Sequence, residues 1–368
     1  MALTTIARDR VFSFSHVVGR ATDQPPPGFN RPYAATFGKP GIAYVVSRGI
    51  QGLGYDPWVA KLKVGAPGEE EYLATIGHRD ENGKGQVVWM ADVAVDSNDL
   101  VYISDEYMQH ILIFDGEGKP LGKWGTHGSA PGELNGPCGL AFDPNDDLYI
   151  VDSLNHRIQK FTKDGKFLTG WGKHGSAQGE FNMPWGITVD TSGYVYVADW
   201  KNHRVQQFTP EGDFVRQFGR PAPNAGRLQY PSSFPRDVQG GHMWRREGTG
   251  GELNHPAHVA VDRDGDVYIT DWANNRVQIY TPDGEFIASL YGDAREPGKW
   301  ADITLSANPD ALKAFRRATH PEDAWRFRMP SGIAIDLETN RIFVCDTIKL
   351  RAQVYVKETD YTDAEFNL

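Results

Sequence analysis

Short stretches in which apolar and polar residues alternate follow one another along most of the chain, and each is closed by a turn. After Pro184, the run GITV stops at Asp190, the turn TSG follows, and the run YVYVA stops at Asp199. Two more runs, at 204–208 and 213–218, complete this stretch. Alternation with a period of two is typical of half-buried β-strands. The pattern therefore predicts four short antiparallel strands.

The same pattern recurs along the chain, and its copies align near their centres. The aspartate that ends the first run of each strong copy stands at Asp96, Asp143, Asp190, Asp262 and Asp336, and a weaker copy covers residues 41–76. One four-stranded unit in about 45 residues is typical of a β-propeller blade. We therefore expect an all-β chain that forms one six-bladed propeller domain over residues 1–368. The expected blades cover residues 32–77, 89–125, 136–172, 183–219, 255–292 and 329–356.

The sixth copy lacks a fourth strand, and the N-terminus supplies one. No run of the type found at 213–218 follows Tyr355, whereas the segment FSFSHVVG at 12–19 has this pattern. A closed ring leaves no unpaired sheet edge exposed to other chains. We therefore expect the strand at 11–19 to pair within the last blade and to close the ring.

Two long connections interrupt the regular spacing, at 220–254 and 293–328. Each leads from an outer strand to the next inner strand, so both should lie on the face where the inner strands begin. The segment PDALKAFRRA at 309–318 predicts a short helix in the second connection. Long connections in a compact domain are usually functional. They could act as lids over a site, or they could only fill the rim.

Composition narrows the class of partner. The chain has 38 Lys and Arg against 48 Asp and Glu, a formal net charge of −10. This charge disfavours nucleic acids and anionic membranes. Two cysteines are too few for a disulfide scaffold, and no run of 18 apolar residues predicts a membrane span. Because Arg8, Asp9 and Arg10 stand where a signal peptide needs an apolar core, we expect a cytoplasmic protein.

A recurring tripeptide before the third strand connects the chain with a known family. It reads Asn155-His156-Arg157 and Asn202-His203-Arg204 in two copies and Asn274-Asn275-Arg276 in a third. In these residues the chain resembles the NHL-repeat family of six-bladed β-propellers. The resemblance implies the fold, and it implies that His156 and His203 are structural. Because this fold carries lyases, hydrolases and interaction modules, it does not by itself fix a function.

Comparison of the copies shows which residues at the mouth of the channel depart from the repeat. The second residue after the repeat proline is glycine in three copies, whereas it is Asp92 in the second blade and His258 in the fifth. These blades lie opposite each other in a six-membered ring, so the two side chains should face across the channel. A hydrogen-bonded pair, with or without an axial water, is one interpretation. A proton-transfer pair or an axial metal site formed by Asp92 and His258 is the other.

Further unusual residues should surround the same mouth. Directly after the second aspartate of a copy, or at the matching position, stand Arg48, Glu106, Trp200 and Trp272, and Tyr107 follows Glu106. Directly after the repeat proline stand Cys138 and Trp185. Tryptophans near an arginine suit a small organic anion or an aromatic ligand. Alternatively, the tryptophans pack beneath the long connections, and Cys138 is a small buried thiol rather than a nucleophile.

Three histidines occur outside the repeat, near the end of the first long connection: His242, His255 and His258. Their spacing matches no specific metal motif, so a three-histidine zinc site is only an alternative. His127 and His174 recur in matched loops and are expected to be structural. We treat His242 as a candidate substrate-binding residue, together with the mouth residues Trp185, Trp200, Trp272, Glu106 and Cys138.

A more distant resemblance concerns the first two blades. The segment VVSRG at 45–49, and ADVAVD at 91–96 followed by SDEY at 104–107, look like the peptidyl-α-hydroxyglycine α-amidating lyases, which are also NHL-type propellers. The resemblance implies that Arg48 binds a substrate oxygen or carboxylate and that Tyr107 shuttles a proton. In that family three histidines directly after the repeat prolines hold zinc. This chain has no histidine there, its residues being Ala91, Cys138, Trp185, Ala257 and Ser331.

Together these features favour an intracellular lyase or hydrolase of a small polar metabolite that acts at the mouth. The candidate catalytic residues are Arg48, Tyr107, Asp92 and His258. One divalent metal, Ca²⁺ or Zn²⁺, is a candidate cofactor at Asp92 and His258, and no organic cofactor is expected. The alternative is a non-catalytic NHL module that binds a ligand or docks a protein.

Overall fold

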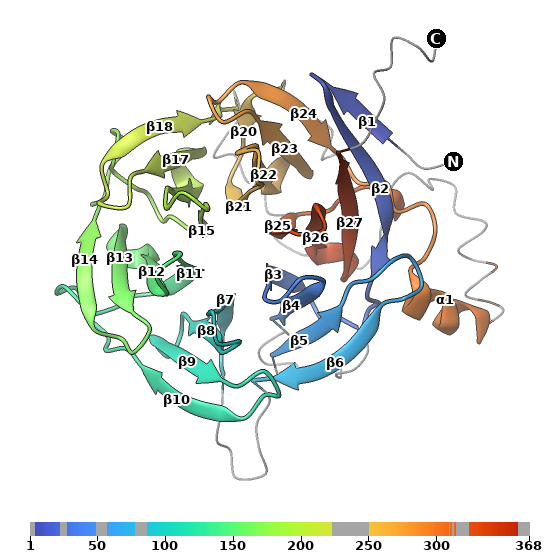
Figure 1. Ribbon diagram of the computed structural model, residues 1–368, viewed down its shortest axis with the longest axis horizontal. Helices are drawn as coiled ribbons and strands as arrows, with labels where there is room; N and C mark the ends of the chain where they lie inside the picture. The colour runs from blue at the N-terminus through green and yellow to red at the C-terminus, as the bar shows by residue number, and fades with distance from the viewer. Residues whose placement is uncertain are drawn as a thin grey trace, which may run out of the picture.

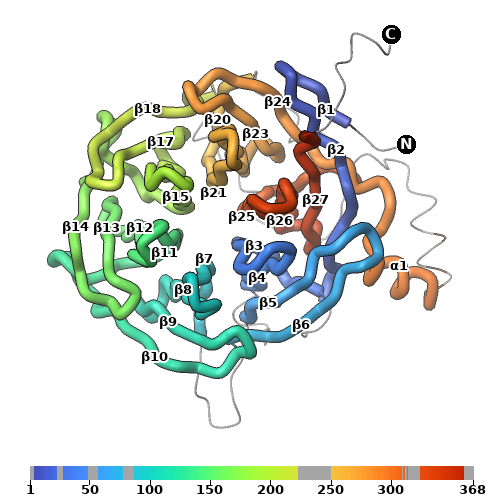
Figure 2. The backbone as a smooth tube through the Cα atoms, in the orientation of Figure 1, coloured from blue at the N-terminus to red at the C-terminus, as the bar shows by residue number. Residues whose placement is uncertain are grey.

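Six four- or five-stranded β-sheets are arranged around a central axis in the computed structural model of the protein (Figure 1; Figure 2). The structure describes residues 4–22, 28–48, 57–77, 87–222, 250–308, 310, 313 and 324–359. The sheets follow one another around the ring in chain order, and the innermost strand of each begins on the same face. We call the axial region on this face the mouth. The prediction of an all-β, six-bladed propeller is confirmed.

Each of blades 1 to 5 has its strands in sequence order from the axis outward. Blade 1 contains β3 (Pro32–Phe37), β4 (Ile42–Ser47), β5 (Trp58–Lys63) and β6 (Glu71–Ile76). Blade 2 contains β7 (Met90–Val95), β8 (Val101–Asp105), β9 (His110–Phe114) and β10 (Pro120–Trp124). Blade 3 contains β11 (Pro137–Phe142), β12 (Asp147–Asp152), β13 (Arg157–Thr162) and β14 (Phe167–Trp171).

The second half of the ring repeats this order. Blade 4 contains β15 (Ile187–Val189), β16 (Val195–Asp199), β17 (Arg204–Phe208) and β18 (Phe214–Phe218). Blade 5 contains β21 (Pro256–Val261), β22 (Val267–Asp271), β23 (Arg276–Tyr280) and β24 (Phe286–Leu290). The short strands β19 (Arg220–Pro221) and β20 (Glu252–Leu253) pair in parallel at the two ends of the first long connection.

Blade 6 is closed by the N-terminus, as predicted. Strands β25 (Pro330–Asp336), β26 (Arg341–Asp346) and β27 (Arg351–Glu358) pair in order, and β2 (Arg10–Val18) pairs antiparallel with β27. An additional outer strand, β1 (Thr4–Ala7), pairs with β2 and was not predicted. The first and last strands of the chain therefore lie in one sheet, and their pairing closes the ring (Figure 1).

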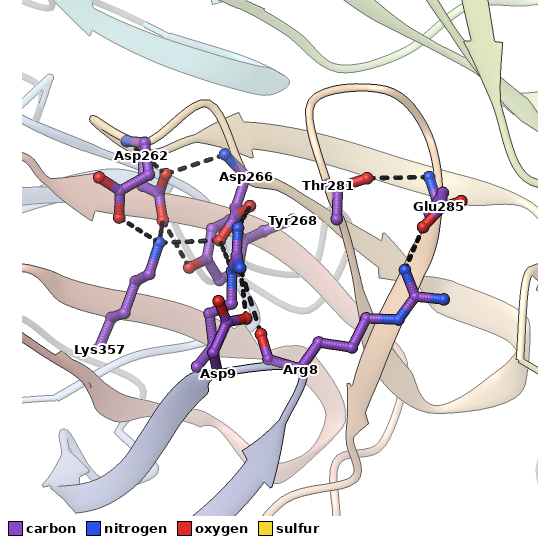
Figure 3. Close-up of polar contacts among 10 residues, drawn as sticks. Arg8, Asp9, Asp262, Asp266, Tyr268, Thr281, Glu285 and Lys357 are labelled. Carbon is purple, nitrogen blue, oxygen red and sulfur yellow. Dashed lines mark hydrogen bonds and ion pairs between the residues drawn. The ribbon is translucent and has the colours of Figure 1, made fainter. Parts of the chain in front are cut away.

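Polar contacts on the face opposite the mouth reinforce this closure (Figure 3). The Lys357 ammonium contacts Asp262 and Asp264 at 2.6 Å and Asp266 at 2.8 Å. Arg10 of β2 donates to both carboxylate oxygens of Asp266, at 3.0 and 3.1 Å. Because Lys357 and Asp266 are buried, these charges stabilise the fold only as a matched set. The contacts join the closing strands of blade 6 to blade 5.

The repeated aspartates have structural roles that explain why the pattern folds in this way. The first aspartate of a copy caps the turn after the inner strand. Oδ1 of Asp190, for example, accepts the N–H groups of Ser192 at 2.8 Å and Tyr194 at 2.9 Å. The second aspartate joins the third strand, as when Oδ2 of Asp199 accepts Nε of Arg204 at 2.9 Å. Such local bonds satisfy backbone donors that the sheet leaves unpaired.

The aspartate–arginine pair at the end of the second strand occurs in four blades. It is formed by Asp152–Arg157, Asp199–Arg204, Asp271–Arg276 and Asp346–Arg351. In blade 2 the residue opposite Asp105 is His110, and in blade 1 Ser47 takes the place of the aspartate. Blades 1 and 2 therefore lack the ion pair that the other four blades use structurally.

The second long connection contains helix α1 (Lys299–Ser306) on the outside of the ring (Figure 1). Its Trp300 packs into the apolar cluster between blades 6 and 1, together with Val18 and Phe29. The helix predicted over 309–318 lies mostly outside the described residues, of which 310 and 313 are helical. Among the described helices, none is long and apolar enough to cross a membrane.

Candidate functional site

Asp92 and His258 meet inside the channel. Asp92 lies in β7 and His258 in β21, on opposite blades, and Nε2 of His258 is 3.4 Å from Oδ2 of Asp92. Both are buried, with 2% and 9% of their surface exposed. The pair is ionic when the imidazole is protonated. The structure thus brings together the two polar residues that take the place of glycine in the repeat; blade 1 has Ala34 there.

The carboxylate of Asp92 also serves the backbone around it. Oδ1 accepts the N–H of Val93 at 2.8 Å, and Oδ2 accepts the N–H of Leu140, in blade 3, at 2.9 Å. Nδ1 of His258 faces the carbonyl oxygen of Val259 at 3.1 Å. Asp92 therefore links blade 2 to blade 3 and reaches across to blade 5.

Two hydroxyl groups that sequence reasoning missed support this pair. The N–H of Asp92 donates to Oγ of Ser104 at 2.9 Å, and that hydroxyl donates to the carbonyl oxygen of Cys138 at 2.5 Å. In the opposite blade, the N–H of His258 donates to Oγ1 of Thr270 at 2.8 Å. The three glycine-containing copies have Val151, Ala198 and Cys345 at this position. A hydroxyl residue directly before the second aspartate could therefore have marked these two blades as unusual in the sequence.

The residues present do not fit a three-histidine zinc centre. The positions directly after the repeat prolines hold no histidine, and His242 lies outside the described residues. His255 packs against His203 and Trp200, with ring centroids 4.4 and 4.6 Å apart. In the described part of the chain, no three His, Cys, Asp or Glu side chains are grouped as ligands. An ion at Asp92 and His258 stays a prediction, and we derive no step through it.

At the rim of the mouth, Arg48 and Glu106 form an ion pair between two aromatic rings. Arg48 follows β4, Glu106 follows β8, and the guanidinium binds the Glu106 carboxylate directly. The Cζ atom of Arg48 lies 4.4 Å from the ring centroid of Tyr33 and 4.5 Å from that of Trp89. Only 10% of the Arg48 side chain is exposed. Cation–π contacts on both sides hold the guanidinium in a partly desolvated position.

Burial at this rim changes the acidity of its groups. Desolvation raises the pKa of Glu106, although Arg48 opposes the shift. Sγ of Cys138 lies 3.5 Å from Oε2 of Glu106 and donates to it. Burial, reinforced by the Glu106 charge, raises the pKa of the Cys138 thiol. Cys138 therefore stays a protonated thiol that orients Glu106, which disfavours a nucleophilic role.

The predicted tryptophans form a continuous aromatic wall at the mouth. Trp185 contacts Trp200, with ring centroids 5.3 Å apart, and Trp200 contacts Trp272 at 6.3 Å. Trp185 also contacts Tyr33 of blade 1 at 5.9 Å, across the ring. The wall therefore reaches the Arg48–Glu106 pair through Tyr33.

Tyr107 does not join this cluster in the structure. Its side chain is 67% exposed, and within the described residues only its backbone groups form hydrogen bonds. Arg48 is instead flanked by Tyr33, whose pKa is raised by burial. The role of Tyr107 as a proton shuttle stays a prediction without a contact to Arg48.

Comparison with known proteins gives the family of the fold. The model described as "SMP-30/Gluconolactonase/LRE-like region" matches residues 91–230, and the NHL repeat model matches residues 253–280. The chain is a six-bladed β-propeller that contains NHL-repeat sequence. No curated protein matches its sequence. The family matches agree with the six blades and with the repeated tripeptides.

Solved structures share the fold of this propeller at low sequence identity. A streptogramin B lyase is 13% identical, with 96% of this chain and 100% of that chain covered and a TM-score of 0.53. A Bacteroides thetaiotaomicron protein of unknown function is 15% identical, with 96% and 77% covered and a TM-score of 0.58. An auxiliary nutrient binding protein from Bacteroides ovatus is 13% identical, with 95% and 77% covered and a TM-score of 0.56. These likenesses show the fold alone.

The histidines of the NHL tripeptide join neighbouring blades. Nδ1 of His156 accepts the N–H of Met183, and Nδ1 of His203 accepts the N–H of His255, both at 3.0 Å. In the third copy, Oδ1 of Asn275 accepts the N–H of Met329 at 2.8 Å. The side chain at this position therefore acts as a hydrogen-bond acceptor that holds the next blade.

Proposed function

We propose that this propeller is a hydrolase or lyase that binds a small polar organic molecule at the mouth, beside Arg48 and Glu106. The observation that carries the proposal is the partly buried ion pair between Tyr33 and Trp89. It lies at blades 1 and 2, which lack the structural aspartate–arginine pair of the other four blades. This arginine is therefore not explained by the architecture of the repeat.

The groups at the rim suit acid–base chemistry on a carbonyl compound. Arg48 can hold a carboxylate or polarise a carbonyl oxygen, because the guanidinium presents several donors in a fixed plane. Glu106, with its raised pKa, is the candidate general acid or base. Cys138 positions the Glu106 carboxylate through its thiol. We leave Tyr107 out of this machinery because its side chain is exposed.

The aromatic wall indicates where the rest of the molecule lies. Trp185, Trp200 and Trp272 present ring surfaces on the side of the mouth opposite blade 1. Apolar and aromatic walls with a few polar groups are typical of small-molecule sites. Beneath the rim, the Asp92–His258 pair holds the inner strands in place, and we assign it a supporting role.

The names of similar proteins suggest which compounds to test first. The matched family description includes gluconolactonase, and one similar structure is a streptogramin B lyase. Because hydrolysis of a ring-closed ester needs a polarised carbonyl and an acid–base group, lactones form the first panel. Linear esters and small carboxylic acids form the second.

Turnover of each panel compound is measured by mass spectrometry with the wild-type protein and with Arg48→Lys and Glu106→Gln. The exposed Arg8–Glu285 ion pair provides matched controls, Arg8→Lys and Glu285→Gln. The proposal predicts that both mouth variants lose at least about 100-fold in kcat/KM while the controls keep it. Turnover that survives in both mouth variants would refute the site. Binding without turnover would favour the alternative, a ligand-binding module.

A further inference from the structure

A pocket opens between blades 4 and 5 on the face opposite the mouth. Its volume is about 370 Å³. Blade 4 contributes the turn that begins at Asp190 and the side chains of Tyr196, Gln207 and Arg216. Blade 5 contributes the turn at 261–265 and Pro282. The pocket is separate from the mouth, so an argument about it does not depend on the proposed function.

Three side chains from neighbouring strands of blade 4 form one wall of the pocket. Tyr196 pairs with Gln207, and Gln207 pairs with Arg216, so the three side chains share one face of the sheet. The hydroxyl of Tyr196 donates to Oδ2 of Asp190 at 3.1 Å and accepts Nε2 of Gln207 at 2.8 Å. Burial raises the pKa of Tyr196, so the phenol keeps its proton. These bonds fix the Gln207 amide, and its Oε1 atom is buried without a hydrogen-bond partner.

Arg216 brings a positive charge to this wall without a matching carboxylate. Nη1 donates to the carbonyl oxygen of Pro282 at 2.9 Å, and Nε is buried without a hydrogen-bond partner. Within the described residues, no carboxylate lies within ion-pairing distance of Arg216. The guanidinium is therefore under-satisfied, which is unusual for a partly buried arginine.

The equivalent rows in the neighbouring blades show that this feature is specific to blade 4. In blade 3 the row is Tyr149, Lys160 and Thr169, and Lys160 binds Asp143 at 2.9 Å and Asp147 at 3.0 Å. In blade 5 the row is Tyr268, Ile279 and Ala288, and Phe12 packs against Tyr268. At the next seam, Lys357 and Arg10 neutralise the aspartates of the blade 5 turn (Figure 3).

We propose that the pocket between blades 4 and 5 binds a free α-amino acid, with the ligand carboxylate on Arg216. A guanidinium and a carboxylate form the strongest type of charge-assisted hydrogen bond. Lys357 already pairs with Asp262 and Asp264, and Arg263 pairs with Glu338. Asp190 also lines the pocket, and no Lys, Arg or His of the described residues pairs with it, so its charge disfavours a simple anion. A zwitterion suits both unpaired groups, since its ammonium group faces Asp190 while its carboxylate faces Arg216.

The test uses the full-length protein and glycine as the probe, with binding followed by isothermal titration calorimetry or ligand-observed NMR. Acetate and methylamine serve as half-ligands that carry only one of the two charges. We expect glycine to bind at least about tenfold more tightly than either half-ligand. Acetate that binds as tightly as glycine would overturn the assignment to a zwitterion, and a lack of glycine binding would overturn the site.

One variant and its matched control test whether the ligand binds at Arg216. Arg216→Gln should weaken glycine binding at least about tenfold. Thr169→Gln introduces the same side chain at the equivalent position of blade 3 and should leave the affinity unchanged. Circular dichroism confirms that both variants are folded. Equal glycine affinity in the wild-type protein and in folded Arg216→Gln would contradict the proposal, whatever the outcome at the mouth.

Discussion

Nε2 of His258 lies 3.4 Å from Oδ2 of Asp92, although 166 residues separate the two in the chain. They are the two polar side chains at the position that is glycine in three copies of the repeat and Ala34 in blade 1. In the three glycine copies, a side chain at this position would collide with the next blade. A Cβ atom on Gly139 would lie 2.5 Å from the carbonyl oxygen of Trp185. In blades 2 and 5, the backbone N–H of the larger residue donates to a hydroxyl group, that of Ser104 or Thr270.

Replacing Asp92 by alanine should destabilise the propeller. The change leaves the N–H groups of Val93 and Leu140 without their acceptors in a buried place. We expect the free energy of unfolding to fall by about 3 kcal/mol. Urea denaturation measures the effect, and Asp92→Asn, which keeps one acceptor oxygen, should lose less. A loss below about 0.5 kcal/mol for the alanine variant would show that the carboxylate does not hold these blades.

Acid should weaken the junction between blades 4 and 5. Burial lowers the pKa of His203 and of His255 to about 4, from 6.5 in the unfolded chain. A depressed histidine pKa means that the unfolded state binds the proton more readily. The contribution to stability is therefore complete above pH 6.5 and is lost as the pH falls from 6.5 towards 4.

A matched variant tests this pH dependence. His203→Asn keeps a hydrogen-bond acceptor for the N–H of His255, as Asn275 does for Met329 in the next blade. Denaturation curves at a series of pH values should show a shallower acid slope for this variant than for the wild-type protein. Identical slopes would mean that the pKa of His203 is the same in the folded and unfolded states, which would contradict the prediction.

The two thiols should react slowly in the native protein. Cys138 and Cys345 are both buried, and burial raises the pKa of each. Because the thiolate is the reactive form, native protein should resist 5,5′-dithiobis(2-nitrobenzoic acid) at pH 8. Unfolding in guanidinium should release both thiols at once. Rapid labelling of native Cys138, mapped by mass spectrometry, would contradict the orienting role given to it.

Ring closure should depend on β2 far more than on β1. Deleting residues 1–18 removes the strand that pairs with β27 and the Arg10 contact with Asp266. We expect this variant to lose cooperative thermal unfolding, since blades 6 and 1 lose their shared packing. Deleting residues 1–7 removes β1 alone and should lower the Tm by only a few degrees. Similar melting of both variants would show that the closure is not stabilising.

The repeat made the fold readable from the sequence. The aspartates that cap turns and bind arginines recur at fixed spacing, so Asp190 and Asp199 predicted the ends of their strands correctly. The additional strand β1 was missed because residues 4–7 are too short for a clear alternation. Helix α1 was missed because the helical pattern at 309–318 was clearer in the sequence than that of Lys299–Ser306.

The site was only partly predictable. Comparison among copies identified Asp92, His258 and the tryptophans, because each departs from the residue that its neighbours share. Tyr33 and Trp89, which enclose Arg48, were missed. Tyr33 lies in the inner strand of the weaker copy, and Trp89 lies just before the aligned segment that begins at Met90, so alignment gave little guidance at either position. The contact between Glu106 and Cys138 depends on the ring geometry and leaves no periodic signal.

The central claim is that Glu106, held by Arg48, supplies the acid–base group at the mouth. The most direct test is the pH dependence of kcat/KM for the first substrate found, in the wild-type protein and in Glu106→Gln. Since burial raises the pKa of Glu106, we predict a limb in the wild-type profile above the usual glutamate value of 4.5. This limb should be absent from the residual activity of the variant. An unchanged profile in Glu106→Gln would contradict the account.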